Sequence, residues 1–438
     1  MNIEKIFYII LSTVLVTVFI LFTFIFSPNE FNSGSSSKQK TIYFVDHISF
    51  AHQKVIDLFN EKNKGFIKVE TINLSFEKFS TNERKELLAR YLRSKNNRID
   101  IFSVDQIWVP RFARWGVPIQ KYLDSTEINT LIPNALETCY YKGSLVAVPL
   151  YIDIALMIYR DDLLKKFSDY VQLKQLIDQS ITWEKFIELS KRFNINTNPF
   201  YIFQADDYEG LICSFTELMA NQGIAFVEAN GKINLDTPQG QKSLQLLVDL
   251  VNKYNAAPKS VTYLKENESY RLFAKSNGVF IRSWSSMFDD EIEFISKETK
   301  SNLRMAPMPH FEGTKPGSVY GGWNLLISKF SERIPEVIKF TKFLLSEESQ
   351  KIMFEEGGYL PTIKTLYEDK KYVQHHPELN FIKKLYKTGV HRPFLERYTN
   401  VSDVLSFYIN KAIKQELTVD EALKEATKKI NEKAILIK

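Results

Sequence analysis

Cysteine is nearly absent from this sequence of 438 residues, which contains only Cys139 and Cys213. Two thiols cannot build a disulfide scaffold or a zinc or iron–sulfur site made of cysteines. We expect two isolated thiols, with a disulfide between them as the alternative. A concentration of one charge is also lacking, because 57 Lys and Arg against 52 Asp and Glu give a net charge of +5 that is spread along the chain. This excludes the basic stripe of a dedicated nucleic-acid-binding protein.

Most catalytic signatures are missing as well. The sequence has no G-x-x-x-x-G-K-[ST] phosphate loop, no G-x-G-x-x-G turn, no G-x-S-x-G elbow and no H-E-x-x-H zinc motif. We therefore expect neither a cofactor nor a metal. A glycoside-active enzyme stays open as an alternative, because sequence alone cannot place two carboxylates at the separation that this chemistry requires.

One long hydrophobic run is present near the N-terminus. Residues 6–26 form 21 uncharged positions, which as a helix span about 31 Å and cross the hydrocarbon core. The run is longer than the apolar part of a usual signal peptide, and neither a small-residue cleavage site nor a lipoprotein cysteine follows it. We predict a transmembrane anchor within residues 1–26, with a long cleaved signal as the alternative. Either places the rest of the chain outside the cytoplasm, after a polar linker over residues 27–40.

Strands and helices alternate in the region that follows. Strands are predicted over 41–45, 66–72 and 99–104, with helical spacing between them and a capping box at Ser80-x-x-Glu83. This alternation predicts an α/β fold with parallel strands. Ligands of such sheets bind beyond the carboxyl ends of the strands, where Asp105 lies.

The middle and the last third of the chain predict a second lobe. Helices are expected to begin after the caps Thr182 and Asp236, and the final helix after the capping box Thr418-x-x-Glu421. Further extended segments are predicted over 145–149, 154–159, 278–284, 303–308 and 323–328.

Aromatic and charged residues gather at predicted strand ends and turns. They are Asp105, Tyr151, Asp153, Trp284 and the run Gly321-Gly322-Trp323. An aromatic face stacks on the apolar face of a sugar ring, and carboxylates and guanidinium groups bond to pairs of hydroxyls. Together they predict binding of a neutral polyol.

Five segments in order resemble the extracellular solute-binding proteins of ABC transporters, in the branch that includes maltose- and trehalose-binding proteins. They are DIFSVDQIW (100–108), KGSLVAVPLYID (142–153, continuing to Tyr159-Arg-Asp161), GVFIRSW (278–284), GGWNLLIS (321–328) and GYLPT (358–362). The chain departs from the family in lacking its lipoprotein cysteine and in having Asp46-His47-Ile48-Ser49 where relatives often have a Gly-rich turn with a Glu.

The resemblance implies a set of sugar-contacting positions. Asp105 and Asp153 would accept hydroxyl protons, and the aromatic side chains would stack. Arg84 and Arg392 would donate hydrogen bonds. The complete implied set is Arg84, Asp105, Tyr151, Asp153, Trp284, Gly322, Trp323 and Arg392.

The resemblance also implies two α/β lobes of the periplasmic-binding-protein type, each with its own sheet. Residues 41–150 and 304–325 would form the N-terminal lobe, and residues 151–303 and 326–438 the C-terminal lobe. The implied function is capture of a carbohydrate, an oligosaccharide or a glycoside, by hinge closure, and its delivery as a monomer to the permease subunits of an ABC transporter at the cell membrane. A membrane-tethered sugar sensor for a signalling partner is the alternative within binding proteins.

Overall fold

The computed structural model describes residues 39–433 apart from residues 77, 96, 226, 229, 230 and 286–294. The predicted anchor within residues 1–26 and nearly all of the linker lie outside these residues. Among the residues that the structure describes, no helix is both long and apolar enough to cross a membrane.

The first lobe begins with three parallel strands, β1 (Lys40–Asp46), β2 (Ile67–Asn73) and β3 (Ile101–Asp105). Helices α2 (Phe50–Lys62) and α3 (Thr81–Arg93) connect them, and the predicted Ser80–Glu83 capping box starts α3. The predicted alternation is therefore confirmed.

Two long strands join the lobes. In β6 (Val148–Arg160) every residue is buried, as in β10 (Ser318–Ile327). The sheet order is β2-β1-β3-β10-β6-β8-β7, and β10 runs antiparallel to both of its neighbours. The first half of β6 pairs with β10, whereas the second half pairs with β8 (Phe280–Trp284) and β9 (Leu303–Ala306). The expectation that each lobe has its own sheet is therefore wrong, because β6 joins the strands of both lobes into one continuous sheet.

Helices cover the second lobe around a core of its own. The predicted cap Thr182 accepts a hydrogen bond from Lys185 N–H at the start of α9 (Trp183–Ser190). The predicted cap Asp236 is wrong, because Thr237 accepts the bond from Gly240 N–H at the start of α11 (Pro238–Asn252). The remaining elements here are α7 (Asp161–Leu164), α8 (Tyr170–Asp178), β7 (Tyr201–Ile202), α10 (Glu209–Asn221), α12 (Glu266–Lys275), α14 (Lys297–Ser301), α17 (Lys364–Glu368), α18 (Lys370–His375), α19 (Glu378–Leu385), β11 (Gly389–Val390), α20 (Tyr398–Ile413) and α21 (Val419–Lys433).

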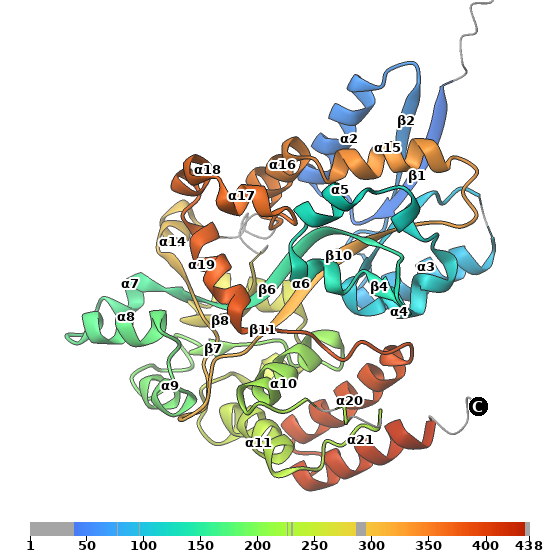
Figure 1. The fold of residues 1–438 in the computed structure, drawn as a ribbon. Helices are drawn as coiled ribbons and strands as arrows, with labels where there is room; N and C mark the ends of the chain where they lie inside the picture. Colours follow the sequence, from blue (N-terminus) through green and yellow to red (C-terminus); the bar gives the residue numbers. More distant parts are fainter. Residues whose placement is uncertain are drawn as a thin grey trace, which may run out of the picture.

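The first lobe is completed by segments from late in the chain. Helices α15 (Ile334–Leu344) and α16 (Glu347–Gly357) pack beside α2 (Figure 1), and the first core includes Val337, Phe340 and Met353. The other elements of this lobe are α4 (Val109–Phe112), α5 (Ser125–Thr130), β4 (Tyr140–Tyr141) and β5 (Ser144–Leu145). The short helix α6 (Pro133–Glu137) follows α5 in the chain, but its buried residue Ala135 belongs to the second core.

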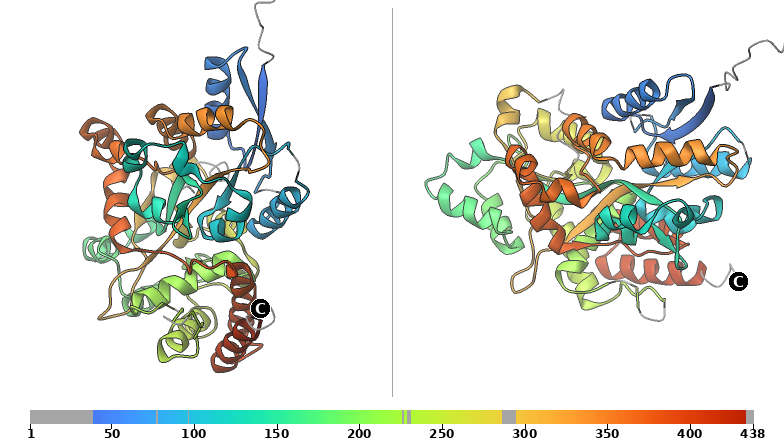
Figure 2. Two further views of the ribbon diagram at one scale, coloured as in Figure 1. Left: turned by 45° about the vertical axis from the view of Figure 1, so that its right-hand side comes forward. Right: turned by 45° about the horizontal axis from the view of Figure 1, so that its top comes forward.

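The two hydrophobic cores meet along the crossing strands. On β6 the first core ends at Tyr151 and the second begins at Ile152, while on β10 Tyr320 belongs to the second core and Trp323 to the first. The packing therefore differs from the predicted division, which placed 304–325 in the N-terminal lobe and all of 326–438 in the C-terminal lobe. In both further views β1 and β2 lie on the opposite side of the molecule from α20 and α21 (Figure 2).

Candidate functional site

A cavity of about 660 Å³ is lined by residues of both lobes. Its volume is in the range of small-molecule sites. Seven of the eight predicted residues line it, namely Asp105, Tyr151, Asp153, Trp284, Gly322, Trp323 and Arg392. Positions that are up to 287 residues apart in the sequence thus share one cavity. Arg84 is the exception, because it does not line this space.

Arg84 lies against Trp323 instead. Its guanidinium carbon is 4.1 Å from the centre of the Trp323 ring, and its Nη2 donates to Asp46 Oδ1 at 2.9 Å. Only 3% of Arg84 is exposed. Burial lowers the pKa of Arg84, and the charge of Asp46 opposes this only in part. The resemblance predicted a hydrogen-bond donor to sugar, but the structure places Arg84 next to the aromatic ring rather than in the cavity.

The backbone at Gly322 determines where Trp323 lies. Gly322 has φ +124°, and a Cβ there would come within 2.6 Å of the Tyr151 carbonyl oxygen on the neighbouring strand. Only glycine fits both conditions. The register between β10 and β6 shifts directly after Trp323, between Trp323 and Asn324.

Trp284 stands at the end of β8, on the other lobe. Arg282 lies over its ring at 4.5 Å and is held by Glu217, with Nη2 donating at 2.7 Å and Nε at 3.2 Å. Burial opposes the charge of Arg282, but the nearby Glu217 carboxylate reverses the effect, so the pKa of Arg282 is raised. Gly321 leaves room for Trp284, because a Cβ there would lie 2.7 Å from the indole ring.

Asp153 holds Ser285, the residue directly after Trp284. Its Oδ1 accepts hydrogen bonds from Ser285 N–H at 2.8 Å, from Ile154 N–H at 2.9 Å and from the Ser285 hydroxyl. The nearby Arg160 pairs with Asp162.

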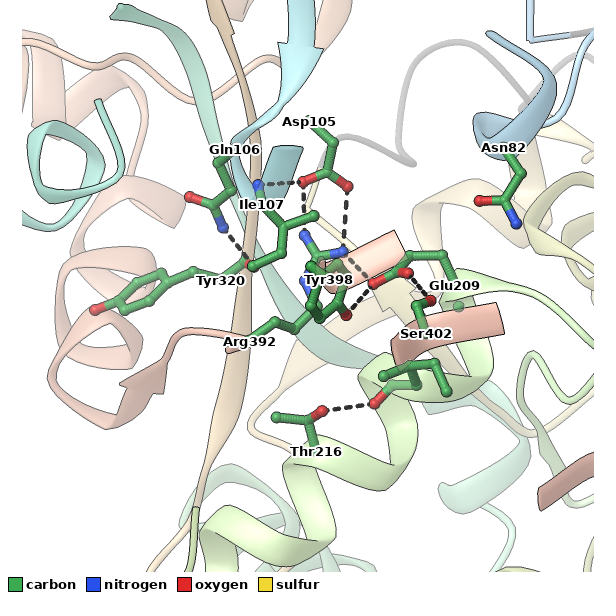
Figure 3. A network of polar contacts seen from close by, with 12 residues as sticks. Asn82, Asp105, Gln106, Ile107, Glu209, Thr216, Tyr320, Arg392, Tyr398 and Ser402 are labelled. Carbon is green, nitrogen blue, oxygen red and sulfur yellow. Dashed lines mark hydrogen bonds and ion pairs between the residues drawn. The ribbon is translucent and has the colours of Figure 1, made fainter. Parts of the chain in front are cut away.

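A buried ionic cluster joins the lobes (Figure 3), and its members Asp105, Glu209 and Arg392 line the cavity. Arg392 donates to Asp105 Oδ1 and Oδ2 at 2.7 and 3.2 Å and to Glu209 Oε1 at 2.7 Å. Glu209 also accepts from the Tyr398 and Ser402 hydroxyls. Asp105 ends β3 of the first lobe and Glu209 starts α10 of the second, so Arg392 connects them.

Sequence analysis missed Glu209, Glu217 and Arg282. Glu209 and Glu217 lie about two helical turns apart on α10. No motif surrounds either residue, so nothing in the sequence indicated their role. Arg282 carried a signal that was not used, since it lies two residues before Trp284 on one strand and side chains at that spacing share a face.

The described residues contain no group of three or more His, Cys, Asp or Glu side chains that could hold a metal ion. Cys139 and Cys213 are both buried, unpaired thiols. Burial raises the pKa of Cys213 to about 12, which leaves this cavity-lining thiol protonated and unreactive.

The family described as bacterial extracellular solute-binding proteins matches residues 54–380. The chain belongs to this family. A probable ABC transporter-binding protein of Deinococcus radiodurans is 26% identical to this solute-binding protein in an alignment 392 residues long, which covers 86% of this chain and 91% of the relative.

Solved structures agree with the family and the fold. Maltose-bound MalE3 of T. maritima is 28% identical, with a TM-score of 0.80 over 89% of this chain and 99% of the other. The GacH receptor of Streptomyces glaucescens, solved unliganded and with acarbose, has a TM-score of 0.77 at 19% identity, over 90% of this chain and 98% of the other. The predicted family and the two-lobed fold are therefore confirmed.

Proposed function

We propose that the cavity binds a carbohydrate, an oligosaccharide or a glycoside, and that the protein delivers it to the permease of an ABC transporter. The observation that carries this proposal is the placement of Trp284 and Trp323, one from each lobe, on one cavity that also holds Asp105 and Asp153. Aromatic faces and carboxylates together match a ring that has one apolar face and hydroxyls at its edge.

The proposed roles follow from position. Tyr151, Trp284 and Trp323 stack on sugar rings, and Asp105, Asp153 and Arg392 bond to hydroxyls at the cavity wall. Arg84 supports Trp323 from its buried position and does not contact the sugar. Gly322 allows the backbone conformation that directs Trp323.

Closure is proposed to occur by bending where β6 and β10 cross between the lobes. A ligand that touches both lobes favours the closed form by its differential affinity for the two forms. The relatives support a sugar as the solute, since T. maritima MalE3 is maltose-bound and a 21% identical Bacillus subtilis relative is an arabinooligosaccharide-binding protein. We propose that the protein acts as a monomer and without catalysis.

A screen of sugars tests the proposed function. Full-length protein in a detergent without a sugar headgroup is melted with monosaccharides, polyols, maltose-series sugars and arabino-oligosaccharides. Because a ligand of the native state raises the melting temperature by mass action, at least one sugar should raise it in a saturable way. No shift with any of them, or release of a cleaved sugar during incubation, would contradict the proposal.

We also propose that residues 6–26 anchor the protein in the membrane with its folded part outside the cytoplasm. The native protein should stay in the membrane fraction after a high-salt wash, with Met1 or Asn2 as its first residue. A mature N-terminus within residues 27–40 would contradict the anchor.

A further inference from the structure

Aromatic side chains line more of the first-lobe side of the large cavity than the predicted platforms Tyr151 and Trp323. Phe76 lies against Trp323 with ring centres 5.5 Å apart, and His47 lies against Phe76 at 4.8 Å. Tyr359 lies against Tyr151 at 4.6 Å. All five side chains line the cavity, and together we call them the aromatic wall. The two predicted platforms are thus part of a larger aromatic surface.

The exposure of these rings increases from the crossing strands β6 and β10 toward helix α2. Tyr151 and Trp323 on the strands are 7% and 9% exposed, whereas His47 and Phe76 are half-buried. Phe50, the first residue of α2, follows His47 by three positions, also lines the cavity and is 64% exposed. Aromatic surface therefore continues outward from the platforms to a ring at the mouth of the cavity.

The fold makes little use of the Phe50 ring. The amino group of Lys54, one helical turn later, lies 5.0 Å from the ring centre and pairs with Glu356. The cap of α2 depends on Ser49, which accepts from His52 N–H. Contiguous exposed apolar surface with a polar rim is typical of a binding site, and Phe50 extends the aromatic wall in this way.

The opposite side of the mouth is polar. Helix α12 begins there, and residues 265–268, which are Lys, Glu, Asn and Glu, line the cavity. Hydrogen bonds from Ser80 lower the pKa of Glu83, and the charge of Lys265 in the second lobe adds to this effect, so the starts of α3 and α12 face each other. A sugar chain that lies along the aromatic wall thus turns hydroxyls toward polar partners on the second lobe.

The size of the cavity favours a ligand of several rings. Its volume of about 660 Å³ lies well inside the range of about 300–1,000 Å³ for sites that enclose drug-sized ligands. A single sugar ring is much smaller than such a ligand. Bound between Trp284 and Trp323, it would leave Phe50 and the outer part of the aromatic wall uncovered.

We propose that the cavity takes a linear oligosaccharide of three or more rings, with its inner rings between Trp284 and Trp323 and an outer ring stacked on Phe50. Phe76 and His47 contact the ring between these two positions. This inference rests on the proposed carbohydrate binding. It adds a preference for chain length and three binding residues to that function.

A series of chain lengths tests the preference. Full-length protein in a detergent without a sugar headgroup is titrated by calorimetry with polyols and with maltose-series sugars and arabino-oligosaccharides of one to five rings. In a series that binds, Kd should fall about tenfold or more from one ring to three, as expected for two added aromatic contacts. A polyol, monosaccharide or disaccharide that binds as tightly as the trisaccharide would overturn this inference and leave the proposed function standing. Absence of binding at every length would overturn both.

Phe50→Ala tests the outer position. Affinity for the trisaccharide and longer chains should fall about threefold to tenfold, the range for a single aromatic contact, and affinity for the disaccharide should fall less. Phe66→Ala is the matched control, because Phe66 is 68% exposed in the same lobe and is not among the described residues that line the cavity. Both variants should melt like the wild type without sugar. An unchanged affinity of Phe50→Ala for the trisaccharide, or an equal loss in Phe66→Ala, would overturn the proposal.

Discussion

The two tryptophans of the large cavity are each covered by a buried arginine, and the two pairs are built in different ways. In the second lobe Arg282 and Trp284 stand two residues apart on β8, and Glu217 binds the guanidinium through both carboxylate oxygens. In the first lobe Arg84 comes from α3 and Trp323 from β10, and Asp46 accepts a single bond from the guanidinium. The same stacking geometry thus arises once from local spacing and once from tertiary packing.

The difference shows what a buried guanidinium needs. Stacking on an aromatic ring stabilises the cation but satisfies none of its N–H groups. Glu217 and Gln204 together accept hydrogen bonds from all three nitrogens of the Arg282 guanidinium. In the first lobe, Nε and Nη1 of Arg84 are buried without a hydrogen-bond partner among the described residues.

The largest effect is expected from removing the carboxylate of the second pair. Glu217→Gln keeps the shape of the side chain but leaves Arg282 buried without its counter-charge, and breaking a buried ion pair costs about 3–5 kcal/mol. The free energy of unfolding, measured in urea without sugar, should fall by about that amount.

The matched change in the first lobe is Asp46→Asn, which disturbs a single bond from Arg84. It should cost less than Glu217→Gln, toward the lower end of the range of about 3–5 kcal/mol for a broken buried ion pair, because one hydrogen bond is lost rather than two. Equal losses for the two variants would mean that hydrogen bonding does not distinguish the pairs.

Asp153→Asn tests the charge beside Trp284. The amide oxygen can still accept from Ser285 and Ile154 N–H, so the unliganded fold should be kept. Sugar binding, measured by calorimetry with the sugar found in the screen, should weaken by about 1.5–3 kcal/mol. Asp162→Asn is the control, because Asp162 pairs with Arg160 away from the cavity. Unchanged affinity in Asp153→Asn would remove this residue from the site.

Trp323→Ala tests the first-lobe platform. If Trp323 stacks on sugar, the variant should lose about 1–3 kcal/mol of binding free energy, as for other anchor residues. Its unfolding without sugar should change less than that of the core variant Trp183→Ala, for which about 3–5 kcal/mol is expected. A loss of unliganded stability as large as that of Trp183→Ala would mean that Trp323 is mainly a core residue.

The smallest effect is expected on the pH dependence of the free energy of unfolding, through His391. Burial and then the charge of Arg392 lower the pKa of His391 to about 4 from the ordinary 6.5. The unfolded chain therefore binds more protons between these values, and stability falls as the pH falls through them. Between pH 7.5 and 5.5 the free energy of unfolding should drop by roughly 1–1.5 kcal/mol through this group. His391→Gln should flatten this part of the pH profile, and an unchanged profile would exclude His391 as its source.

Local sequence patterns predicted the strands β1, β2 and β3 and a helix cap of the first lobe. The strands that became β1, β2 and β3 and the Ser80–Glu83 box depend on neighbouring residues, and the structure confirms them. The family resemblance named seven residues that share the cavity. The predicted division between residues 150 and 151 lies one position from the change of core on β6, which falls between Tyr151 and Ile152. The division later in the chain could not be located, because β10 is buried along its whole length and carries no mark where it passes from one core to the other.

Long-range pairings were equally out of reach. Nothing near Arg84 indicates that it will meet Trp323, 239 positions later, rather than a sugar. Glu209 is similarly isolated in the sequence, and only the fold brings it to Arg392. Asp236 and Thr237 both belong to residue types that cap helices well, and a difference of one residue is below what a sequence pattern resolves.

The position of β10 also sets the order in which the chain can fold. This strand begins at Ser318, yet it lies between β3, which ends at Asp105, and β6, which ends at Arg160. Until the chain has been synthesised past Ile327, the strand that lies between β3 and β6 and pairs with both is missing. The edges of β3 and β6 are then open to pairing with other chains. Contacts over such sequence distances fold slowly. A chain that is cut short before residue 318 would therefore aggregate rather than form a smaller stable lobe.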